Sequence, residues 1–400
     1  NNGGFSIIIG NPPYGISRDQ KISELENKII KSKFKKYISG KPNKYMLFMA
    51  KSAEMLAADG IVSMVVPNSW LGIKSAKALR EYFLKDLNLT DLITYDSRVF
   101  KDPSFEAVIF AAKKQKIKTN LKIQNFKSAK ENLALRTVSV PLPTLLKRPA
   151  MTIPINWSEE TDHVMNNIFS NSFLLGDLSS PFIPRIALQA YATGKGTPPQ
   201  SKSDLKNRIF DFTQKVDINT FPYLDGADIT RFKINWSMQF LKHGKWLADP
   251  QPIERFKGPR VLIREILGRA PYTLISAFTD ETYLYNKSVL HILPKTHEVS
   301  KELLIALSAI LNSKLGTFII RNVGRKSQRK LFPKLVNDDL RSFPLPNNLS
   351  KFAPLLCELA LKLSSQSDTN SIFMTDLDYE VFAAYGLNQS DSELIQKSLA

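Results

Sequence analysis

Asn-Pro-Pro-Tyr, residues 11–14, is the short stretch whose residue types and spacing could perform chemistry. It follows the apolar run Phe5–Ile9, which is typical of a short buried strand. Two consecutive prolines end a strand abruptly. They also restrict the backbone on both sides, because each ring fixes φ and pushes the preceding residue to extended geometry. The motif is therefore expected at the carboxyl end of a strand, the edge where open α/β sheets bind ligands.

The chemistry that these residues could support is the activation of an amino group. Asn11 offers its side-chain carbonyl, and Pro12 offers its main-chain carbonyl, whose direction is fixed by the ring of Pro13. Two acceptors converging on one NH2 group would turn the nitrogen lone pair out of ring conjugation and toward an electrophile, a form of preorganised electrostatic catalysis. Tyr14 adds a flat face on which a planar base or amide could stack. The alternative is a strand followed by a rigid turn.

The elements that must position this motif are typical of an α/β domain. Strand and helix signals alternate through the first hundred-odd residues, the pattern of a largely parallel sheet. Asn43 is expected to cap a helix that Gly60 ends. Together these elements make only half of a doubly wound sheet. The expected strands are Phe5–Ile9, Ile61–Val66, Leu92–Tyr95 and Glu106–Ala112, and a further helix is expected near Ser75–Lys85.

The chain changes character after this first domain. The segment VPLPTLLKRP concentrates three prolines with lysine and arginine, which is typical of a connector. Beyond it, short strands separated by turn residues, and helices at Lys301–Ile320, predict an α+β domain. Helical spacing returns after Ser350 and predicts a small helical tail. The expected boundaries are 1–115 for the first domain, 116–155 for the connector, 156–346 for the α+β domain and 347–400 for the tail.

The formal net charge of +18 is the first signal of a partner. Such an excess of lysine and arginine favours a polyanion, with nucleic acid the leading candidate, although a merely soluble basic surface has the same composition. Cys357 is the only cysteine, which excludes an internal disulfide and a cysteine-based zinc site, and we expect no metal. No apolar run reaches the roughly 18 residues needed to cross a bilayer and no leader pattern opens the chain, so a cytoplasmic protein is expected.

These motifs resemble those of the gamma-class amino-methyltransferases of DNA adenine that carry a TaqI-type C-terminal specificity domain. Besides the opening motif, the pattern N-x-Y-x-x-F at Asn43–Phe48, the segment V-V-P-N-S-W-L at Val65–Leu71 and V-F at Val99–Phe100 are similar to family segments. In the second domain, FPYLDGADITRF, PRVLIRE, SVLHILP and AILNSKLGTFIIR look like recurring segments of the specificity domain. The resemblance covers most of the chain.

The resemblance implies a DNA adenine-N6 methyltransferase of a type II restriction-modification system that uses S-adenosylmethionine. Asn11 and Pro12 would accept hydrogen bonds from the adenine N6 amino group, and Tyr14 would stack on the base. Phe100 would pack against the same base, and Phe48 would border the adenosyl part of the cofactor. Such a base cannot be reached inside a duplex, so the enzyme would flip it out. A methylsulfonium donor is reactive enough that no general base is required.

Recognition of a site in double-stranded DNA would require contacts to base edges and to phosphates. The segment Pro184–Pro199 is rich in small, flexible residues and holds a lysine between two glycines, and the segment from Arg321 to Lys334 is strongly basic. For each single cation, a solvated surface charge is the alternative. The candidate DNA-binding residues are Lys195, Arg321, Arg325, Lys326, Arg329 and Lys330.

The sequence departs from the family before the catalytic loop. The glycine-rich turn and the acidic residue that hold the cofactor belong there, yet only ten residues precede Asn11. We therefore expect a fragment, completed by an N-terminal segment or a separate subunit, that is inactive alone, binds S-adenosylmethionine weakly and leaves Phe5–Ile9 with an unpaired side. Two alternatives stay open: a DNA-binding specificity module without activity of its own, and a protein glutamine methyltransferase, which also uses Asn-Pro-Pro-Tyr on an amide nitrogen.

Overall fold

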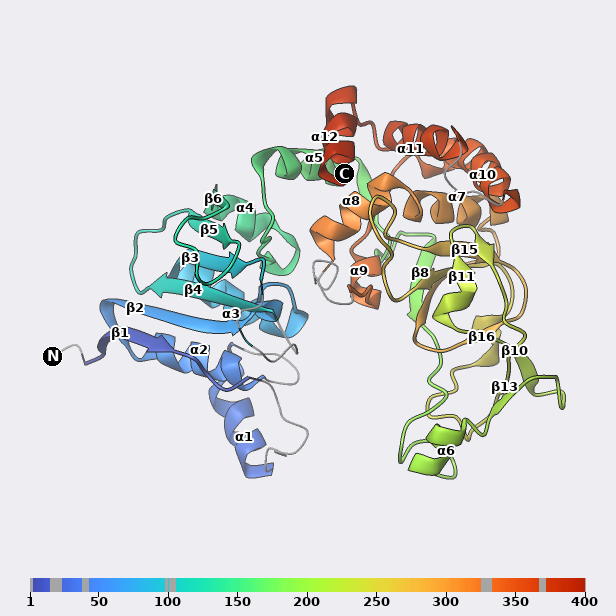
Figure 1. Ribbon diagram of the computed structural model, residues 1–400, viewed down its shortest axis with the longest axis horizontal. Coiled ribbons are helices and arrows are strands. Elements are labelled where there is room, and N and C mark those ends of the chain that lie inside the picture. Colours follow the sequence, from blue (N-terminus) through green and yellow to red (C-terminus); the bar gives the residue numbers. More distant parts are fainter. Residues whose placement is uncertain are drawn as a thin grey trace. The chain divides into compact units, whose positions relative to one another are not determined.

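The computed structural model of the 400-residue chain divides into two compact units, residues 1–159 and 160–400 (Figure 1). Both units combine helices with strands, so the predicted α/β class of the first and α+β class of the second are confirmed. The structure describes residues 3–14, 24–37, 43–97, 100, 106–324, 333–366 and 372–399.

A six-stranded sheet, counted over the described residues, forms the centre of the first unit. Its strands are β1 (Phe5–Gly10), β2 (Leu56–Pro67), β3 (Asn88–Tyr95), β4 (Ala107–Lys113), β5 (Leu121–Phe126) and β6 (Arg136–Val140). The order across the sheet is β1-β2-β4-β3-β5-β6. β1 runs parallel to β2 and β3 runs parallel to β5, whereas β4 lies antiparallel between β2 and β3. The sheet is therefore mixed rather than largely parallel.

Helix α2 (Lys44–Glu54) covers one face of this sheet. Its apolar positions recur at helical spacing, and Met46, Met49 and Ala53 are fully buried against it. Along β2 every second side chain from Val62 to Val66 points into the same cluster, as the period of a strand requires. The other helices of this unit are α1 (Glu24–Lys33), α3 (Lys77–Glu81) and α4 (Leu142–Lys147).

Gly60 has a different role from the predicted one. α2 ends at Glu54, and Gly60 lies inside β2, six residues later. A Cβ atom at this glycine would lie 2.6 Å from the main-chain oxygen of Phe5, so a residue without a side chain lets β1 approach β2. The preceding Asp59 has a φ of +62°. The glycine is required by strand pairing rather than by a helix end.

The segment expected to be a connector, residues 116–155, contributes two strands to the first sheet. β5 pairs in parallel with β3, and β6 pairs with β5. Leu121 and Ile123 are buried in the cluster of the first unit, while Lys122 between them is exposed. The prolines that suggested a connector begin only at Pro141, after the second of these strands ends.

β1 is an edge strand. Among the described residues it pairs only with β2, so its other side carries unpaired main-chain groups, as expected from the sequence. The side chains on one of its faces are also uncovered: Phe5, Ile7 and Ile9 are 55%, 66% and 81% exposed. Ile8, on the opposite face, packs against the buried cluster. An apolar face beside a free edge is a surface that another element can cover.

The second unit is built on short antiparallel strands. One four-stranded sheet has the order β15 (Ser276–Thr279), β14 (Arg260–Arg264), β17 (Val289–Pro294) and β8 (Phe182–Ile186). Another has the order β16 (Leu284–Tyr285), β10 (Thr220–Leu224), β13 (Phe240–Lys242) and β9 (Asp211–Phe212). Two-stranded pairs join β11 (Ile229–Thr230) to β12 (Lys233–Ile234) and β7 (Ser172–Leu174) to β18 (Pro344–Pro346).

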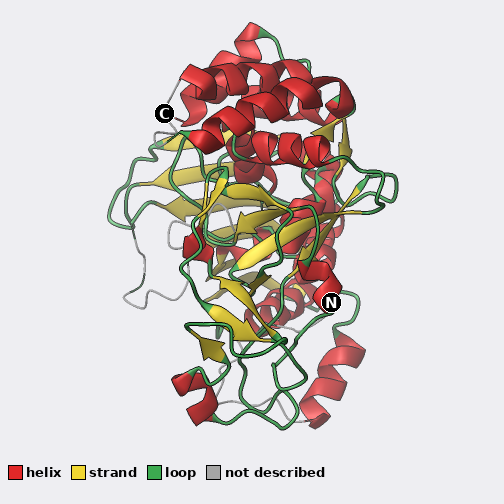
Figure 2. Cartoon of the chain, turned by 90° about the vertical axis from the view of Figure 1, so that its right-hand side faces the viewer, coloured by secondary structure: helices red, strands yellow, loops and turns green. Residues whose placement is uncertain are grey.

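Helices gather over one side of these strands (Figure 2). They are α5 (Glu159–Ser170), α7 (Lys301–Leu311), α8 (Lys314–Val323), α9 (Asn337–Arg341), α10 (Leu349–Ser365), α11 (Ile372–Ala384) and α12 (Gln389–Leu399), with α6 (Lys202–Asn207) at the opposite end of the unit (Figure 1). The C-terminal residues are helical, as predicted, but α10, α11 and α12 share one hydrophobic core with α7 and β14. The tail is therefore an integral layer of the second unit.

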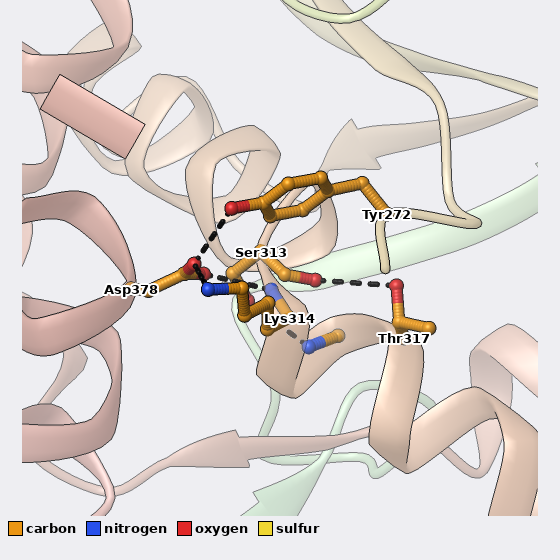
Figure 3. Close-up of polar contacts among 6 residues, drawn as sticks. Tyr272, Ser313, Lys314, Thr317 and Asp378 are labelled. Carbon is orange, nitrogen blue, oxygen red and sulfur yellow. Dashed lines mark hydrogen bonds and ion pairs between the residues drawn. The ribbon is translucent and has the colours of Figure 1, made fainter. Parts of the chain in front are cut away.

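The helical segment predicted at Lys301–Ile320 forms two helices, α7 and α8, which meet at an angle of 70°. The break is fixed by side chains: Ser313 Oγ accepts a hydrogen bond from the Gly316 amide at 3.0 Å and caps α8. Asp378 of α11 accepts hydrogen bonds from the Lys314 amide at 2.8 Å and the Tyr272 hydroxyl at 2.9 Å (Figure 3). Within the described residues, no single helix has the length and composition of a membrane span, although α7 and α8 taken together do.

Candidate functional site

The opening motif lies at the carboxyl end of β1, beside the end of β2. Asn11 is exposed, Pro12 is buried and Tyr14 is half-buried. The Tyr14 hydroxyl donates a hydrogen bond to Asn11 Oδ1 and also lies 3.1 Å from the main-chain oxygen of Val65. Burial raises the pKa of Tyr14, so this hydroxyl keeps its proton at neutral pH. Asn11 thus presents its side-chain carbonyl at the end of β1. The neighbouring donor, the Tyr14 hydroxyl, has a second acceptor within reach in the main-chain oxygen of Val65.

Phe100 stands at the same edge as Tyr14. Their ring centroids are 6.3 Å apart and the ring planes are inclined by 58°. This separation lies within the range of aromatic pairs that attract each other. The fold therefore brings two of the predicted aromatic residues together from distant parts of the sequence.

Phe48 occupies the outer side of α2. Its side chain is 49% exposed, whereas Met46 and Met49 on the same helix are fully buried. The ring therefore contributes little to the core of the first unit. Its contact with a cofactor stays a prediction.

Polar contacts hold the segment that follows β2. Asn68 donates from its main-chain amide to the oxygen of Glu106 and from its side chain to the Glu106 carboxylate, both at 2.8 Å. The Tyr45 hydroxyl lies 3.0 Å from Ser69 Oγ, which ties the same segment to α2. Sequence reasoning assigned no role to Asn68 or Glu106. Only their positions beside the V-V-P segment and the strand Glu106–Ala112 could have drawn attention to them.

Arg80 is a buried cation beside the segment that follows β2. Its side chain is fully buried and donates hydrogen bonds to the main-chain oxygens of Trp70, Ile73, Ala150 and Met151. A buried cation is tolerated when every donor is satisfied in this way. The sequence contained no signal for it, because an arginine in a short helix ordinarily faces solvent.

No metal site accompanies these residues in the part of the chain that the structure describes: no group of three or more His, Cys, Asp or Glu side chains could hold an ion there. At the end of β1 stand a hydrogen-bond acceptor, Asn11, and two flat apolar rings, those of Tyr14 and Phe100. Such an arrangement can hold a planar molecule by stacking and orient its amino group.

The predicted DNA-binding residues fall into three groups. Lys195 is exposed at the tip of the loop between β8 and α6. Arg321 is only half-exposed in the last turn of α8, where burial lowers the pKa of its guanidinium. The remaining four, Arg325, Lys326, Arg329 and Lys330, lie outside the described residues.

Two families match this chain. Residues 1–100, which contain the opening motif, match the Eco57I restriction-modification methylase family. Residues 221–345, which form much of the second unit, match the TaqI-like C-terminal specificity domain. The two matches occur in the order expected from the sequence.

Curated relatives agree with these families. Type II methyltransferase M.HincII of Haemophilus influenzae is 32% identical over 127 residues, which are 31% of this chain and 25% of that protein. Type II methyltransferase M.TthHB8I of Thermus thermophilus is 32% identical over 114 residues, 28% of this chain and 26% of that protein. Type II restriction enzyme and methyltransferase RM.Eco57I of Escherichia coli is 30% identical over 100 residues, 24% of this chain and 10% of that protein. The matched segments thus span about a quarter or less of each relative.

Solved structures share the fold. The Type IIL restriction-modification enzyme MmeI, solved in complex with DNA, aligns with a TM-score of 0.58 at 12% identity, covering 98% of this chain and 56% of that one. The ATP-dependent Type ISP restriction-modification enzyme LlaBIII, solved bound to DNA, aligns with a TM-score of 0.51 at 11% identity, covering 90% of this chain and 30% of that one. In its two family matches and its curated relatives this chain is similar to restriction-modification methyltransferases that carry a C-terminal specificity domain, and it shares the fold of the solved restriction-modification enzymes.

Proposed function

We propose that this chain is part of a DNA adenine-N6 methyltransferase and carries its catalytic loop and its specificity domain. The observation that carries the proposal is the cluster at the end of β1, where the carbonyl of Asn11 lies within reach of Tyr14 and the ring of Phe100 stands 6.3 Å from the ring of Tyr14. An adenine between or against these rings would be held by stacking. Its N6 amino group would then donate to Asn11 Oδ1 and to the main-chain oxygen of Pro12.

Binding of the base would displace the Tyr14 hydroxyl from Asn11. The main-chain oxygen of Val65, 3.1 Å from that hydroxyl, is the acceptor to which it would turn, so the exchange leaves no donor unsatisfied. With both N6 hydrogens bound, the N6 lone pair would point away from the ring and toward the methyl donor, and the N–C bond would form as the methyl–sulfur bond of the donor breaks. S-adenosylmethionine supplies this methyl group as an electrophile when bound. The extra proton on N6 then leaves to solvent.

A segment that this chain does not contain would complete the sheet and bind most of the cofactor. The support for this step is the free edge of β1 and the uncovered face of Phe5, Ile7 and Ile9. Covering these three side chains would remove apolar surface from water. Each Å2 of apolar surface buried in this way would stabilise the contact by about 25 cal/mol. Phe48, exposed on α2, would then border the adenosyl part.

The second unit would bind double-stranded DNA. Its match to a specificity domain and the positive charge of the chain, +18, support this partner over a protein substrate, so a glutamine methyltransferase is the weaker alternative. The target adenine would be flipped out of the duplex to reach Asn11. A cytoplasmic location, expected from the sequence, agrees with such a substrate.

Methyl transfer tests the proposal. The chain, joined to the segment encoded upstream of it, is incubated with duplex DNA and with S-adenosylmethionine labelled in its methyl group, and the products are digested to nucleosides. We expect labelled N6-methyladenosine. Asn11→Ala should lower the rate by about 100-fold or more, the size of an electrostatic contact made in the transition state, and should leave DNA binding intact. Asn132→Ala, at an exposed asparagine of the first unit, is the matched control.

The possible outcomes separate the alternatives. If the label appeared in glutamine of a protein substrate and not in DNA, the methylated group would be an amide and the adenine proposal would be refuted. If the joined protein bound DNA but transferred no methyl group, the protein would be a DNA-binding specificity module and not an enzyme. Equal rates for the unaltered protein and Asn11→Ala would refute the catalytic role of the opening motif.

A further inference from the structure

Gln200 organises the loop that follows β8. This side chain is only 4% exposed, and all of its hydrogen-bonding atoms have partners. Its Nε2 donates to the main-chain oxygens of Ala190 and Trp246, each at 2.8 Å, and its Oε1 accepts from the amide of Ala192 at 2.8 Å. One amide group therefore ties the beginning of the loop to its end and to the neighbouring segment around Trp246.

The main chain of the same residue closes the tip of the loop. The Gln200 amide donates to the oxygen of Lys195 at 2.7 Å, and its oxygen accepts from the amide of Gly194 at 2.9 Å. Gly194 and Gly196, on either side of Lys195, have φ values of +74° and +85°, which a residue with a side chain rarely adopts. A Cβ atom on Gly196 would lie 2.3 Å from the oxygen of Trp246. The conformation around Lys195 is therefore set before any partner arrives.

Aromatic rings form a rigid base under the loop. Tyr191 and Phe210 stack with their centroids 5.6 Å apart, and Phe210 lies 6.3 Å from Trp246. The Tyr191 hydroxyl donates to the Asp211 carboxylate at 2.7 Å and accepts from the Phe210 amide at 2.9 Å. The loop is thus anchored on side chains from β9 and from the segment after β13. Loops of this kind lose little freedom when they bind.

Lysines without ion-pair partners among the described residues lie on the loop, beside its tip and on the helix that follows it. The Thr197 amide donates to the main-chain oxygen of Lys245 at 2.9 Å, which places a second lysine beside the tip, and α6 follows the loop directly. The two acidic residues closest in the chain are engaged: Asp204 closes a capping box with Ser201, and Asp211 forms an ion pair with Arg208. Within the described residues, none of four exposed lysines forms an ion pair: Lys195, Lys202, Lys206 and Lys245.

We propose that the loop of residues 190–200 is a preformed clamp for the phosphate backbone of double-stranded DNA, with Lys195 as the contact and Gln200 as the positioning residue. This inference rests on the proposed function and adds to it where and how the second unit holds DNA. A polyanion is the partner that four unpaired lysines around one rigid loop would recognise. Gln200 touches no DNA and acts by holding Lys195 in the bound geometry.

The test is the salt dependence of DNA binding by the 400-residue chain. The probe is a fluorescent duplex of about 30 base pairs, titrated between about 50 and 200 mM salt. Lys195→Ala should weaken binding about tenfold at the lowest salt and reduce the slope of log K against log salt by about 0.9, the value for one lost phosphate contact. Gln200→Ala should weaken binding to a similar extent. Lys397→Ala, at an exposed lysine of α12, is the matched control and should change neither quantity.

The two substitutions should not be additive. If Gln200 acts through Lys195, then Lys195→Ala made in the Gln200→Ala background should cost less than about threefold. Gly194→Ala should also weaken binding, because it strains the loop while its added Cβ meets no atom within 4 Å. This variant tests the loop conformation without removing a buried side chain.

Two failures are distinguishable. DNA binding by the unaltered chain with an unchanged slope in Lys195→Ala would overturn the clamp and leave the proposed function standing. Full additivity of the two substitutions would overturn the positioning role of Gln200. Absence of DNA binding by the unaltered chain would overturn the proposed DNA partner, and the clamp with it.

Discussion

Acidification is expected to destabilise the second unit through one side chain, His291 of β17. The ring is fully buried, with the centroids of Phe256 and Tyr285 at 6.0 and 5.3 Å. Neither ring nitrogen has a hydrogen-bond partner among the described residues. Burial, reinforced by the positive charges of Arg260 and two further arginines, lowers the pKa of His291 from 6.5 to about 3. The folded protein therefore holds this histidine neutral.

The magnitude follows from the two pKa values. Between pH 6.5 and about 3 the unfolded chain binds a proton at His291 that the folded chain does not, so stability is lost as the pH falls through this range. One proton corresponds to about 1.4 kcal/mol per pH unit, which gives about 2 kcal/mol between neutral pH and pH 5. Above pH 6.5 the histidine is neutral in both states and contributes no pH dependence.

Urea unfolding at a series of pH values is the assay, with His291→Phe as the test variant. Phenylalanine keeps an aromatic ring but binds no proton, so the stability of the unaltered chain relative to this variant should fall by about 2 kcal/mol between pH 7 and about pH 5. Val261→Ala is the control, because Val261 of β14 is fully buried, pairs with Ile292 and does not titrate. It should lower stability equally at every pH. A constant difference between the unaltered chain and His291→Phe would refute a neutral, buried histidine.

Three further predictions concern packing and assembly. Gly60→Ala should cost about 1–3 kcal/mol in urea unfolding, because its Cβ would lie 2.6 Å from the Phe5 oxygen; Gly3→Ala, where nothing lies within 4 Å, is its control. Asp378→Ala should lower the free energy of unfolding by about 3 kcal/mol, since it leaves the Lys314 amide and the Tyr272 hydroxyl without their acceptor, and the exposed Asp376→Ala should be nearly neutral. Ile9→Lys should leave the stability of this chain almost unchanged and should prevent co-elution with the segment proposed to complete the sheet; co-elution that survives the change would place that segment elsewhere.

Local patterns predicted most of the first unit. The apolar run before two prolines predicted β1 and its end, and the strands expected at Ile61–Val66, Leu92–Tyr95 and Glu106–Ala112 correspond to β2, β3 and β4. Such patterns are readable because each depends on neighbouring residues only. β5 was missed because its alternation, Leu121 and Ile123 around Lys122, is short and is followed by segments rich in turn residues.

Longer-range contacts decided what the sequence concealed. The apolar pattern of Lys301–Ile320 indicated helix without marking a break, but Asp378, more than fifty residues further along the chain, accepts the first amide of α8 and stabilises a break there. Gly60 resembled a helix end until its contact with Phe5 was known. In both cases the deciding atom comes from a distant segment, so no local pattern contains it.

The sequence alone determined which groups the opening motif offers, two carbonyl oxygens and a flat ring, because side-chain type and proline geometry belong to the residues themselves. It also determined the basic character of the chain, since charge is a property of composition. Only the tertiary structure decided that Tyr14 stands between Asn11 and Phe100, that β1 has a free edge, and that Gln200 fixes the loop around Lys195. The contacts of Tyr14 with Phe100, of β1 with β2 and of Gln200 with Trp246 join residues far apart in the chain, so folding alone sets them.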